Sequence, residues 1–317
     1  MSLISVGING LGRIGKGVML QLLDDSNFDI KAINVPSIKN ENLQRYLNND
    51  STQLLKNKIE VKIENENYIS IGRHYIRVYH TREVSCLNWN EVGVKYLFEC
   101  SGKYLTTEKS KKHNVEYLIM SAPPKDLEKT PMYCPGVNEN KYNGENIISL
   151  ASCTTNSISP FLKKVLETNI VVHDINFITI HASTASQSIV DEANDEKRTS
   201  RSIFNNLIPH STGAQKTIDY LLPSLVGKVK GTSLRIPINT VSMIDVNIRF
   251  RENVNKDHFL NLLSEDDIFQ INNDNLVSSD FIGNKSPSIL DKSCTMQLTE
   301  KSIKFGLWYD NEWSFCC

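Results

Sequence analysis

Short apolar runs alternate along the first half of the chain with segments whose apolar residues recur every three or four positions. Runs of β-branched and aromatic residues predict strands, and the periodic segments predict helices. We expect strands at residues 3–8, 28–35, 59–63, 75–79, 96–100, 117–120 and 146–150, and helices that include 17–23 and 106–113. Strands that alternate with helices predict an α/β domain over residues 1–151, with a doubly wound parallel sheet covered on both faces.

The pattern changes near residue 152. Longer alternating runs predict strands at 175–181, 231–236 and 241–250, and helices are expected at 212–222 and 256–263. Long strands with alternating burial are typical of a largely antiparallel sheet that has helices packed on one face. We therefore expect a second domain of the α+β class over residues 152–305.

Composition is compatible with two globular domains and excludes several classes of protein. The chain has 317 residues, with 35 basic and 36 acidic side chains and a net charge of −1, so no excess charge favours nucleic acid or an anionic membrane. It contains no apolar stretch long enough to span a bilayer and no signal-peptide pattern. Seven cysteines without clustered spacing favour a reducing compartment over a disulfide scaffold. We expect a cytoplasmic protein without a metal site.

A glycine-rich turn follows the first predicted strand. Residues 10–15, Gly-Leu-Gly-Arg-Ile-Gly, have the spacing G-x-G-x-x-G and open a predicted helix. Glycines at these positions let the backbone approach a pyrophosphate, whose charge is met by the helix N-terminus. The turn therefore predicts dinucleotide binding by a Rossmann-type domain, and a glycine turn that serves only packing is the alternative.

The second predicted strand ends at Val35, where the dinucleotide fingerprint has an Asp or Glu that accepts hydrogen bonds from the ribose hydroxyls. Valine offers no acceptor, so the usual exclusion of a 2′-phosphate is relaxed and NADP joins NAD as a candidate cofactor. Ser37 and Lys39 lie just beyond and can meet such a phosphate, although both can equally be ordinary loop residues.

A candidate nucleophile stands where the apolar run 147–151 meets a predicted helix. Cys153 lies in the first turn of that helix, where the helix dipole favours the thiolate, the form that attacks carbonyl carbons. His181 ends a predicted strand and can serve as general base if it comes within hydrogen-bond reach of Cys153. The alternatives are a small buried cysteine and a capping or surface histidine.

Together these residues resemble the phosphorylating glyceraldehyde-3-phosphate dehydrogenase family. Residues 8–15 match the family's opening and residues 151–156, Ala-Ser-Cys-Thr-Thr-Asn, match its active-site signature. Further matches follow in the family's order at 32–34, 121–123, 136–138, 181–185, 211–214, 234–237 and 308–312.

The resemblance implies a glycolytic and gluconeogenic enzyme, a homotetramer, that oxidises glyceraldehyde 3-phosphate to 1,3-bisphosphoglycerate and reduces a nicotinamide cofactor. Cys153 would form a hemithioacetal and then a thioester, with His181 as general base, and inorganic phosphate would release the acyl group.

The resemblance also assigns binding residues. Thr184 and Arg235 would bind the phosphate carried on the substrate. The attacking phosphate would meet Ser152, Thr154, Thr212 and Gly213, with charge from Arg198 or Arg201, because residues 191–202 align too poorly to choose between the two arginines. Residues 195–198 can also be a solvated charge run. The implied cofactor residues are Gly10, Gly12, Arg13, Ile14, Val35, Arg82, Ser121 and Asn311.

Departures from the family pattern keep other hypotheses open. Besides Val35, Leu150 replaces a usual asparagine, and the sequence stops at Cys317, where the family continues into a terminal helix that packs on the dinucleotide domain. Residues 306–317 are expected to return to that domain. The alternatives are an NADP-dependent or erythrose-4-phosphate-type dehydrogenase, a divergent non-catalytic paralogue that acts as a binding protein, and a thiol hydrolase.

Overall fold

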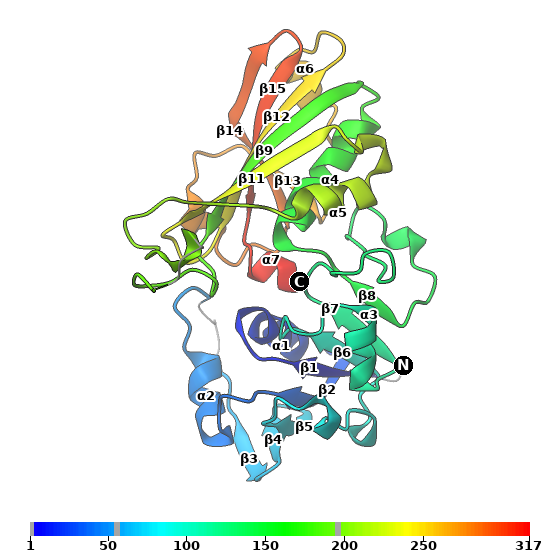
Figure 1. Cartoon of the computed structure of the whole chain (residues 1–317), viewed down its shortest axis with the longest axis vertical. Coiled ribbons are helices and arrows are strands. Elements are labelled where there is room, and N and C mark those ends of the chain that lie inside the picture. The colour runs from blue at the N-terminus through cyan, green and yellow to red at the C-terminus, as the bar shows by residue number, and fades with distance from the viewer. Residues whose placement is uncertain (1–2, 54–57, 194–197) are drawn as a thin grey trace. The chain divides into compact units, whose positions relative to one another are not determined.

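The chain forms two compact units. A computed structural model describes residues 3–53, 58–193 and 198–317 (Figure 1). Unit 1 contains the chain up to Tyr133, residues 140–151 and the last two residues, and unit 2 contains residues 134–139 and 152–315. None of the described helices is long and apolar enough to cross a membrane.

Unit 1 is built on a sheet with the strand order β3-β4-β5-β2-β1-β6-β7-β8. The strands are β1 (Ile4–Asn9), β2 (Phe28–Asn34), β3 (Lys62–Asn65), β4 (Tyr68–Ile71), β5 (His74–Tyr79), β6 (Tyr96–Glu99), β7 (Tyr117–Met120) and β8 (Ile147–Ser149). All neighbours from β5 to β8 are parallel, whereas β3 and β4 form an antiparallel edge. The predicted Rossmann-type sheet is confirmed.

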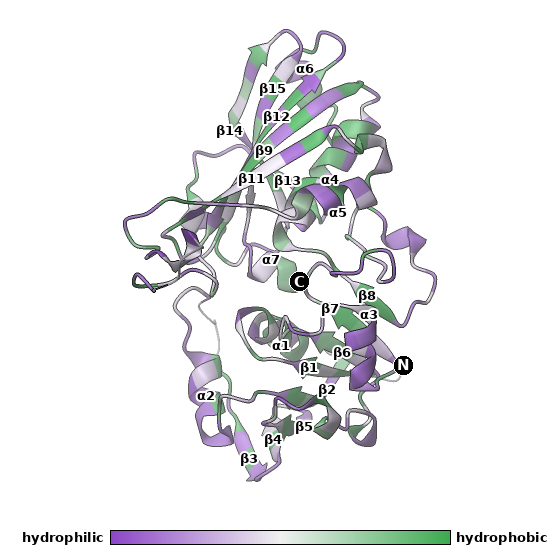
Figure 2. Ribbon diagram, viewed as in Figure 1, coloured by the Kyte–Doolittle hydropathy of each residue, from purple (hydrophilic) through white to green (hydrophobic). Residues whose placement is uncertain are grey.

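Helix α1 (Arg13–Asp24) connects β1 to β2, and α2 (Asn40–Asn48) and α3 (Thr107–Ser110) follow further along the chain. Many residues along the strands of this sheet are hydrophobic (Figure 2). Consecutive residues of a strand point to opposite sides, so their side chains form apolar clusters on both faces. On β6, Leu97 joins one apolar cluster while Tyr96 and Phe98 pack against the other. The strand order reverses around β1, which puts the glycine turn at the position where doubly wound sheets bind ligands.

Unit 2 is built on a sheet with the order β10-β11-β9-β12-β15-β14-β13. Its strands are β9 (Val172–Ala182), β10 (Ile208–His210), β11 (Val229–Ile236), β12 (Ser242–Phe250), β13 (Phe269–Asn272), β14 (Ser288–Thr299) and β15 (Ser302–Tyr309), and its helices include α4 (Cys153–Glu167), α5 (Ala214–Leu221) and α6 (Lys256–Asn261). Only the β11–β9 and β13–β14 pairs are parallel among those described. The predicted α+β class with a largely antiparallel sheet is confirmed.

Several elements differ from the sequence-based expectation. The strand expected at 59–63 begins only at Lys62 and pairs with β4, which was not expected; β3 is exposed along its length, whereas Ile69 and Ile71 of β4 are buried. Likewise β14 and β15 were not expected; they form a long hairpin, and on β14 the apolar side chains of Met296 and Leu298 are 57% and 47% exposed.

The segment expected at 306–317 to return to the dinucleotide-binding domain is also shorter in the structure. Residues 306–315 belong to unit 2, where β15 lies between β12 and β14, and only Cys316 and Cys317 belong to unit 1. Cys316 ends the short helix α7 (Trp313–Cys316), and its Sγ lies 3.4 Å from the carbonyl oxygen of Ile14 on α1.

Candidate active site

Cys153 opens helix α4 of unit 2. Ser152 caps this helix in an extended conformation, and its Oγ accepts a hydrogen bond of 3.2 Å from the backbone N–H of Thr155. A serine at this position satisfies one of the free amide groups of the first turn. The cap therefore determines where the helix begins and holds the half-buried thiol of Cys153 in its first turn.

His181 lies near the end of β9, and its Nε2 is 3.5 Å from Cys153 Sγ. Its Nδ1 lies 2.8 Å from the carbonyl oxygen of Ala182. Nδ1 faces both this carbonyl, which only accepts, and the guanidinium of Arg235, which only donates. The tautomer with the ring proton on Nδ1, donated to the carbonyl, directs the lone pair of Nε2 at the thiol, as a general base requires. The structure thus brings the two predicted catalytic residues into contact in a geometry suited to proton transfer.

Arg235 on β11 completes this group. It lies opposite His181 in the parallel β11–β9 pair, contacts the imidazole Nδ1, and donates a hydrogen bond of 3.2 Å to the carbonyl oxygen of Ala182. Its Nε is buried and has no hydrogen-bond partner among the described residues. A guanidinium with an unused donor, next to a nucleophile, is suited to holding a substrate anion.

Burial and the charge of Arg235 determine the protonation of the catalytic pair. Desolvation, helped by Arg235, lowers the pKa of His181 to about 4, and burial raises the pKa of Cys153 against the opposing influence of Arg235. The ligand-free protein therefore favours a neutral thiol beside a neutral imidazole. The thiolate expected from the helix dipole alone is disfavoured, because desolvation of the thiol outweighs the dipole.

Tyr309, a residue that sequence reasoning did not single out, supports the site from β15. It is fully buried, and its hydroxyl lies 3.1 Å from Thr154 Oγ1 and 2.9 Å from Thr179 Oγ1. Its ring stands edge-on to His181, with 6.1 Å between the ring centres. The only signal in the sequence was its position within the matching block 308–312.

The other predicted anion-binding residues differ in their environments. Thr184 is exposed, and its hydroxyl donates a hydrogen bond to Gln187 Oε1. Thr212 Oγ1 accepts a hydrogen bond from the backbone N–H of Ala214 at the start of α5, and Gly213 is the N-cap of that helix. The two candidate arginines are exposed: Arg201 pairs with Asp191 at 3.0 Å, and no described contact links either Arg198 or Arg201 to the catalytic pair. Residues 195–197 of the predicted charge run lie outside the described residues.

Unit 1 contains a cavity of about 510 Å³ around the glycine turn. Gly10 has φ +90°, and a Cβ there would lie 2.9 Å from the backbone of Ser101, whereas a Cβ on Gly12 would meet nothing within 4 Å. Open space over a turn of this kind fits a pyrophosphate. Predicted residues that line the cavity are Gly10, Gly12, Val35 and Arg82.

The remaining predicted cofactor residues are not among those that line this cavity. Arg13 pairs with Asp50 at 2.9 Å, so its guanidinium is engaged within the protein. Ile14 follows it in the first turn of α1, and Ser121 Oγ donates to the carbonyl oxygen of Glu99 at 3.0 Å. In unit 2, Asn311 is 5% exposed, and its Oδ1 accepts a hydrogen bond of 2.8 Å from Ser242 Oγ.

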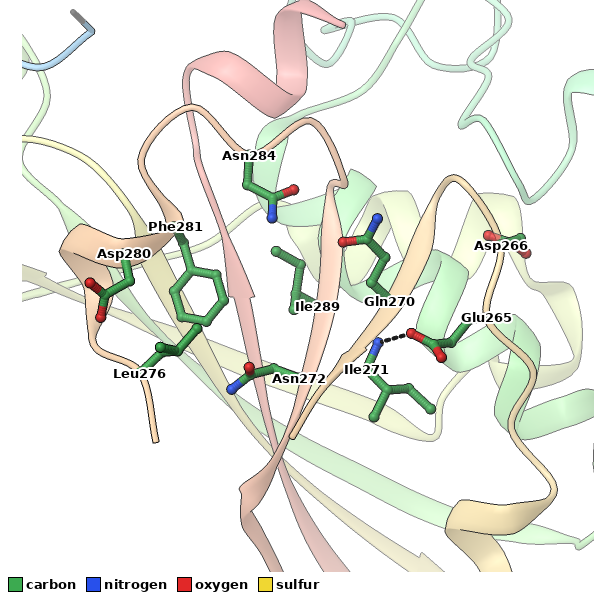
Figure 3. A pocket seen from close by; sticks show the side chains of 10 residues that line it. All are labelled: Glu265, Asp266, Gln270, Ile271, Asn272, Leu276, Asp280, Phe281, Asn284 and Ile289. Atoms are coloured by element: carbon green, nitrogen blue, oxygen red, sulfur yellow. Dashed lines mark hydrogen bonds between the residues drawn. The ribbon is translucent and has the colours of Figure 1, made fainter. Parts of the chain in front are cut away.

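A second cavity, of about 520 Å³, lies in unit 2, and its described lining includes none of the predicted site residues (Figure 3). Its carboxylates are engaged within the protein: Asp266 pairs with Lys164 at 2.7 Å, and Glu265 and Asp280 accept hydrogen bonds from backbone N–H groups. Across the described part of the chain, no cluster of three or more histidine, cysteine or acidic side chains has the geometry of a metal site.

Comparison with known proteins agrees with this arrangement. Residues 4–107 match the family described as the NAD-binding domain of glyceraldehyde 3-phosphate dehydrogenase, and residues 152–311 match its C-terminal domain. A glyceraldehyde-3-phosphate dehydrogenase of Colletotrichum lindemuthianum is 34% identical, covering 99% of this chain and 95% of the relative. A cytosolic one of Taxus baccata is 34% identical, covering 98% and 94%, and one of Trichoderma koningii is 35% identical, covering 98% and 94%.

These matches extend over both units and confirm the resemblance that the sequence motifs indicated. The chain belongs to the glyceraldehyde 3-phosphate dehydrogenase family, nicotinamide-dependent oxidoreductases that act on an aldehyde group.

Proposed function

We propose that this chain converts glyceraldehyde 3-phosphate and inorganic phosphate to 1,3-bisphosphoglycerate with reduction of NAD, a step of glycolysis and gluconeogenesis. The observation that carries the proposal is the 3.5 Å contact between Cys153 Sγ and His181 Nε2 at the start of α4. Relatives that match nearly the whole chain bear the name of this enzyme.

The proposed acylation begins when Cys153 Sγ attacks the aldehyde carbon and the thiol proton moves to His181 Nε2. The backbone N–H of Cys153 and the imidazolium stabilise the oxyanion of the hemithioacetal. A nicotinamide cofactor, when bound, supplies the hydride acceptor that oxidation of this adduct requires. The imidazolium first returns its proton to the oxyanion, which gives the hydroxyl of the hemithioacetal. When this adduct is oxidised, neutral His181 takes the hydroxyl proton, so the acyl group remains on Cys153 as a thioester.

In the second half of the proposed reaction, an oxygen of inorganic phosphate attacks the thioester carbon and the carbon–sulfur bond breaks, which returns the thiolate of Cys153. We assign the attacking phosphate to Ser152, Thr154, Thr212 and Gly213, with charge from Arg198 or Arg201. Thr184 and Arg235 would hold the phosphate carried on the substrate. The unused buried Nε of Arg235 supports this assignment.

We also propose that NADP can replace NAD. Among the described residues, no carboxylate lines the cavity around the glycine turn, while the exposed cations Arg82 and Lys103 do. Val35 is 2% exposed and packs in the apolar cluster of unit 1, so it presents no charge against a 2′-phosphate. Comparison of kcat/KM for the two cofactors tests this, and a large preference for NAD would reject it.

We further propose a cytoplasmic homo-oligomer, a tetramer by family membership. In support, four large apolar side chains between residues 189 and 207 are 58–69% exposed: Ile189, Val190, Phe204 and Leu207. Exposed apolar groups that lie close together in a chain indicate a contact surface. Sizing of the protein in solution tests the assembly, and a monomer would contradict it.

The decisive experiment gives the purified protein glyceraldehyde 3-phosphate, phosphate and either cofactor while the absorbance of the reduced nicotinamide is followed. Turnover that disappears in Cys153→Ser supports the proposal. Turnover retained in that variant would mean that another residue is the nucleophile. Absence of turnover with both cofactors, while Cys153 still reacts with iodoacetate, would favour the non-catalytic paralogue.

A further inference from the structure

His210 is a histidine that the proposed mechanism does not use, and it stands directly ahead of residues 211–213. It lies opposite Ser233 in the antiparallel β10–β11 pair, while Ile208, two residues earlier, lies opposite Arg235. Arg235 in turn lies opposite His181 on β9. Because paired residues, and residues two apart in a strand, share one face of a sheet, His210 lies on the same face as Arg235 and His181. The charge of His210 accordingly contributes to lowering the pKa of His181.

The hydrogen bonding of His210 determines what its free nitrogen can do. Its Nδ1 lies 2.6 Å from the carbonyl oxygen of Ser211. A carbonyl only accepts, so the proton of the neutral imidazole is on Nδ1 and Nε2 is an acceptor. Among the described residues Nε2 has no hydrogen-bond partner, and the side chain is half-buried.

A second, independent observation on the same face indicates a ligand. Ser233 is 3% exposed and its Oγ has no hydrogen-bond partner in the described structure, and the same holds for the buried Nε of Arg235. Buried polar groups in proteins almost always have partners. The unused hydroxyl of Ser233, opposite His210 in the β10–β11 pair, therefore marks a place where an anion completes the hydrogen bonding.

We propose that His210 binds the inorganic phosphate of the reaction, accepting through Nε2 the hydrogen that monohydrogen phosphate carries on one oxygen. The proposal rests on the function proposed above, which supplies phosphate as co-substrate. The Ser233 hydroxyl donates to an oxygen that carries no hydrogen, while Arg235 holds the phosphate carried on the substrate. Sulfate has the same shape and charge but no hydrogen to donate, so an acceptor at this position selects phosphate over sulfate.

The test compares His210→Ala with His258→Ala, a control on the exposed surface of α6. At pH 8.5, where an imidazole is neutral, we expect the KM for phosphate to rise about tenfold in His210→Ala, the equivalent of about 1.4 kcal/mol. The inhibition constant of sulfate and the burst of reduced cofactor without phosphate, which reports acylation, stay within about twofold. His210→Gln, whose amide oxygen can accept, recovers part of the loss.

A KM for phosphate within about twofold of the wild type in His210→Ala would overturn the proposal, and so would equal weakening of sulfate and phosphate. A wild-type protein without a burst would refute the proposed function instead. Calorimetric titration of wild type and His210→Ala with phosphate and with sulfate decides the role of His210 in either case, because binding is measured without turnover. Weaker phosphate binding with unchanged sulfate binding supports the proposal.

Discussion

Replacement of Asp50 by asparagine should loosen the glycine turn of unit 1. The Asp50 side chain is 6% exposed and accepts hydrogen bonds from Lys16 Nζ and Arg13, each at 2.9 Å, and from the backbone N–H groups of Thr52 and Gln53. These contacts lower the pKa of Asp50 despite the opposing effect of burial. The carboxylate thus joins the end of α2 to the first turn of α1.

The expected loss follows from the burial of the partner. Lys16 is 5% exposed, so Asp50→Asn leaves a buried ammonium without its counterion, a change that costs about 3–5 kcal/mol in proteins. Lys16 keeps its bonds to the carbonyl oxygens of Tyr46 and Asn49, which favours the lower end, about 3 kcal/mol. The KM for the cofactor should rise as well, because the same turn borders the cofactor cavity.

Urea unfolding followed by hydrogen exchange of α1 and β2 amides measures the free energy of unfolding of unit 1 specifically. The matched control is Asp174→Asn, since Asp174 pairs with Arg249 at the surface, where such a pair contributes about 0–1 kcal/mol. Adding Lys16→Met to Asp50→Asn removes the buried charge and should restore part of the stability. Equal losses in the two single variants, or no restoration in the double variant, would refute the reasoning.

Other predictions concern two glycines at which a side chain would clash, and the protonation of His181. Gly10→Ala should abolish cofactor binding in a calorimetric titration, because alanine is strained at φ +90° and its Cβ would clash with the backbone of Ser101. Near-normal affinity would contradict this. Gly231→Ala places a Cβ 2.2 Å from the Phe177 ring and should lower the denaturation midpoint clearly, which an unchanged midpoint would disprove. In the folded protein the pKa of His181 is about 4, whereas in the unfolded chain it is about 6.5. The unfolded chain therefore takes up a proton first, and the free energy of unfolding falls as the pH drops from 6.5 toward 4. Between pH 7 and 4.5 the wild type should lose about 2 kcal/mol more than His181→Asn, and equal losses would count against that assignment.

The sequence alone was sufficient for the classes of the two sheets and for the chemical character of the site. Period-two and helical patterns are local, so they report whether a segment alternates between core and solvent, and the glycine turn and the run around Cys153 are local as well. The strand β3 was predicted with an earlier start, whereas β4 and the β14–β15 hairpin were not predicted; β4 has only four residues and much of β14 is exposed, so the apolar pattern there is short or weak.

The tertiary structure alone decided which distant residues meet and how they ionise. Strand register aligns His181, Arg235 and the face that carries His210, and no local pattern encodes the pairing of strands separated by long stretches of chain. Burial reverses the charge state expected for Cys153, because desolvation depends on everything packed around a group rather than on its neighbours in sequence. The sequence thus determined which chemical groups are present, and folding determined which of them share a site and in which protonation state.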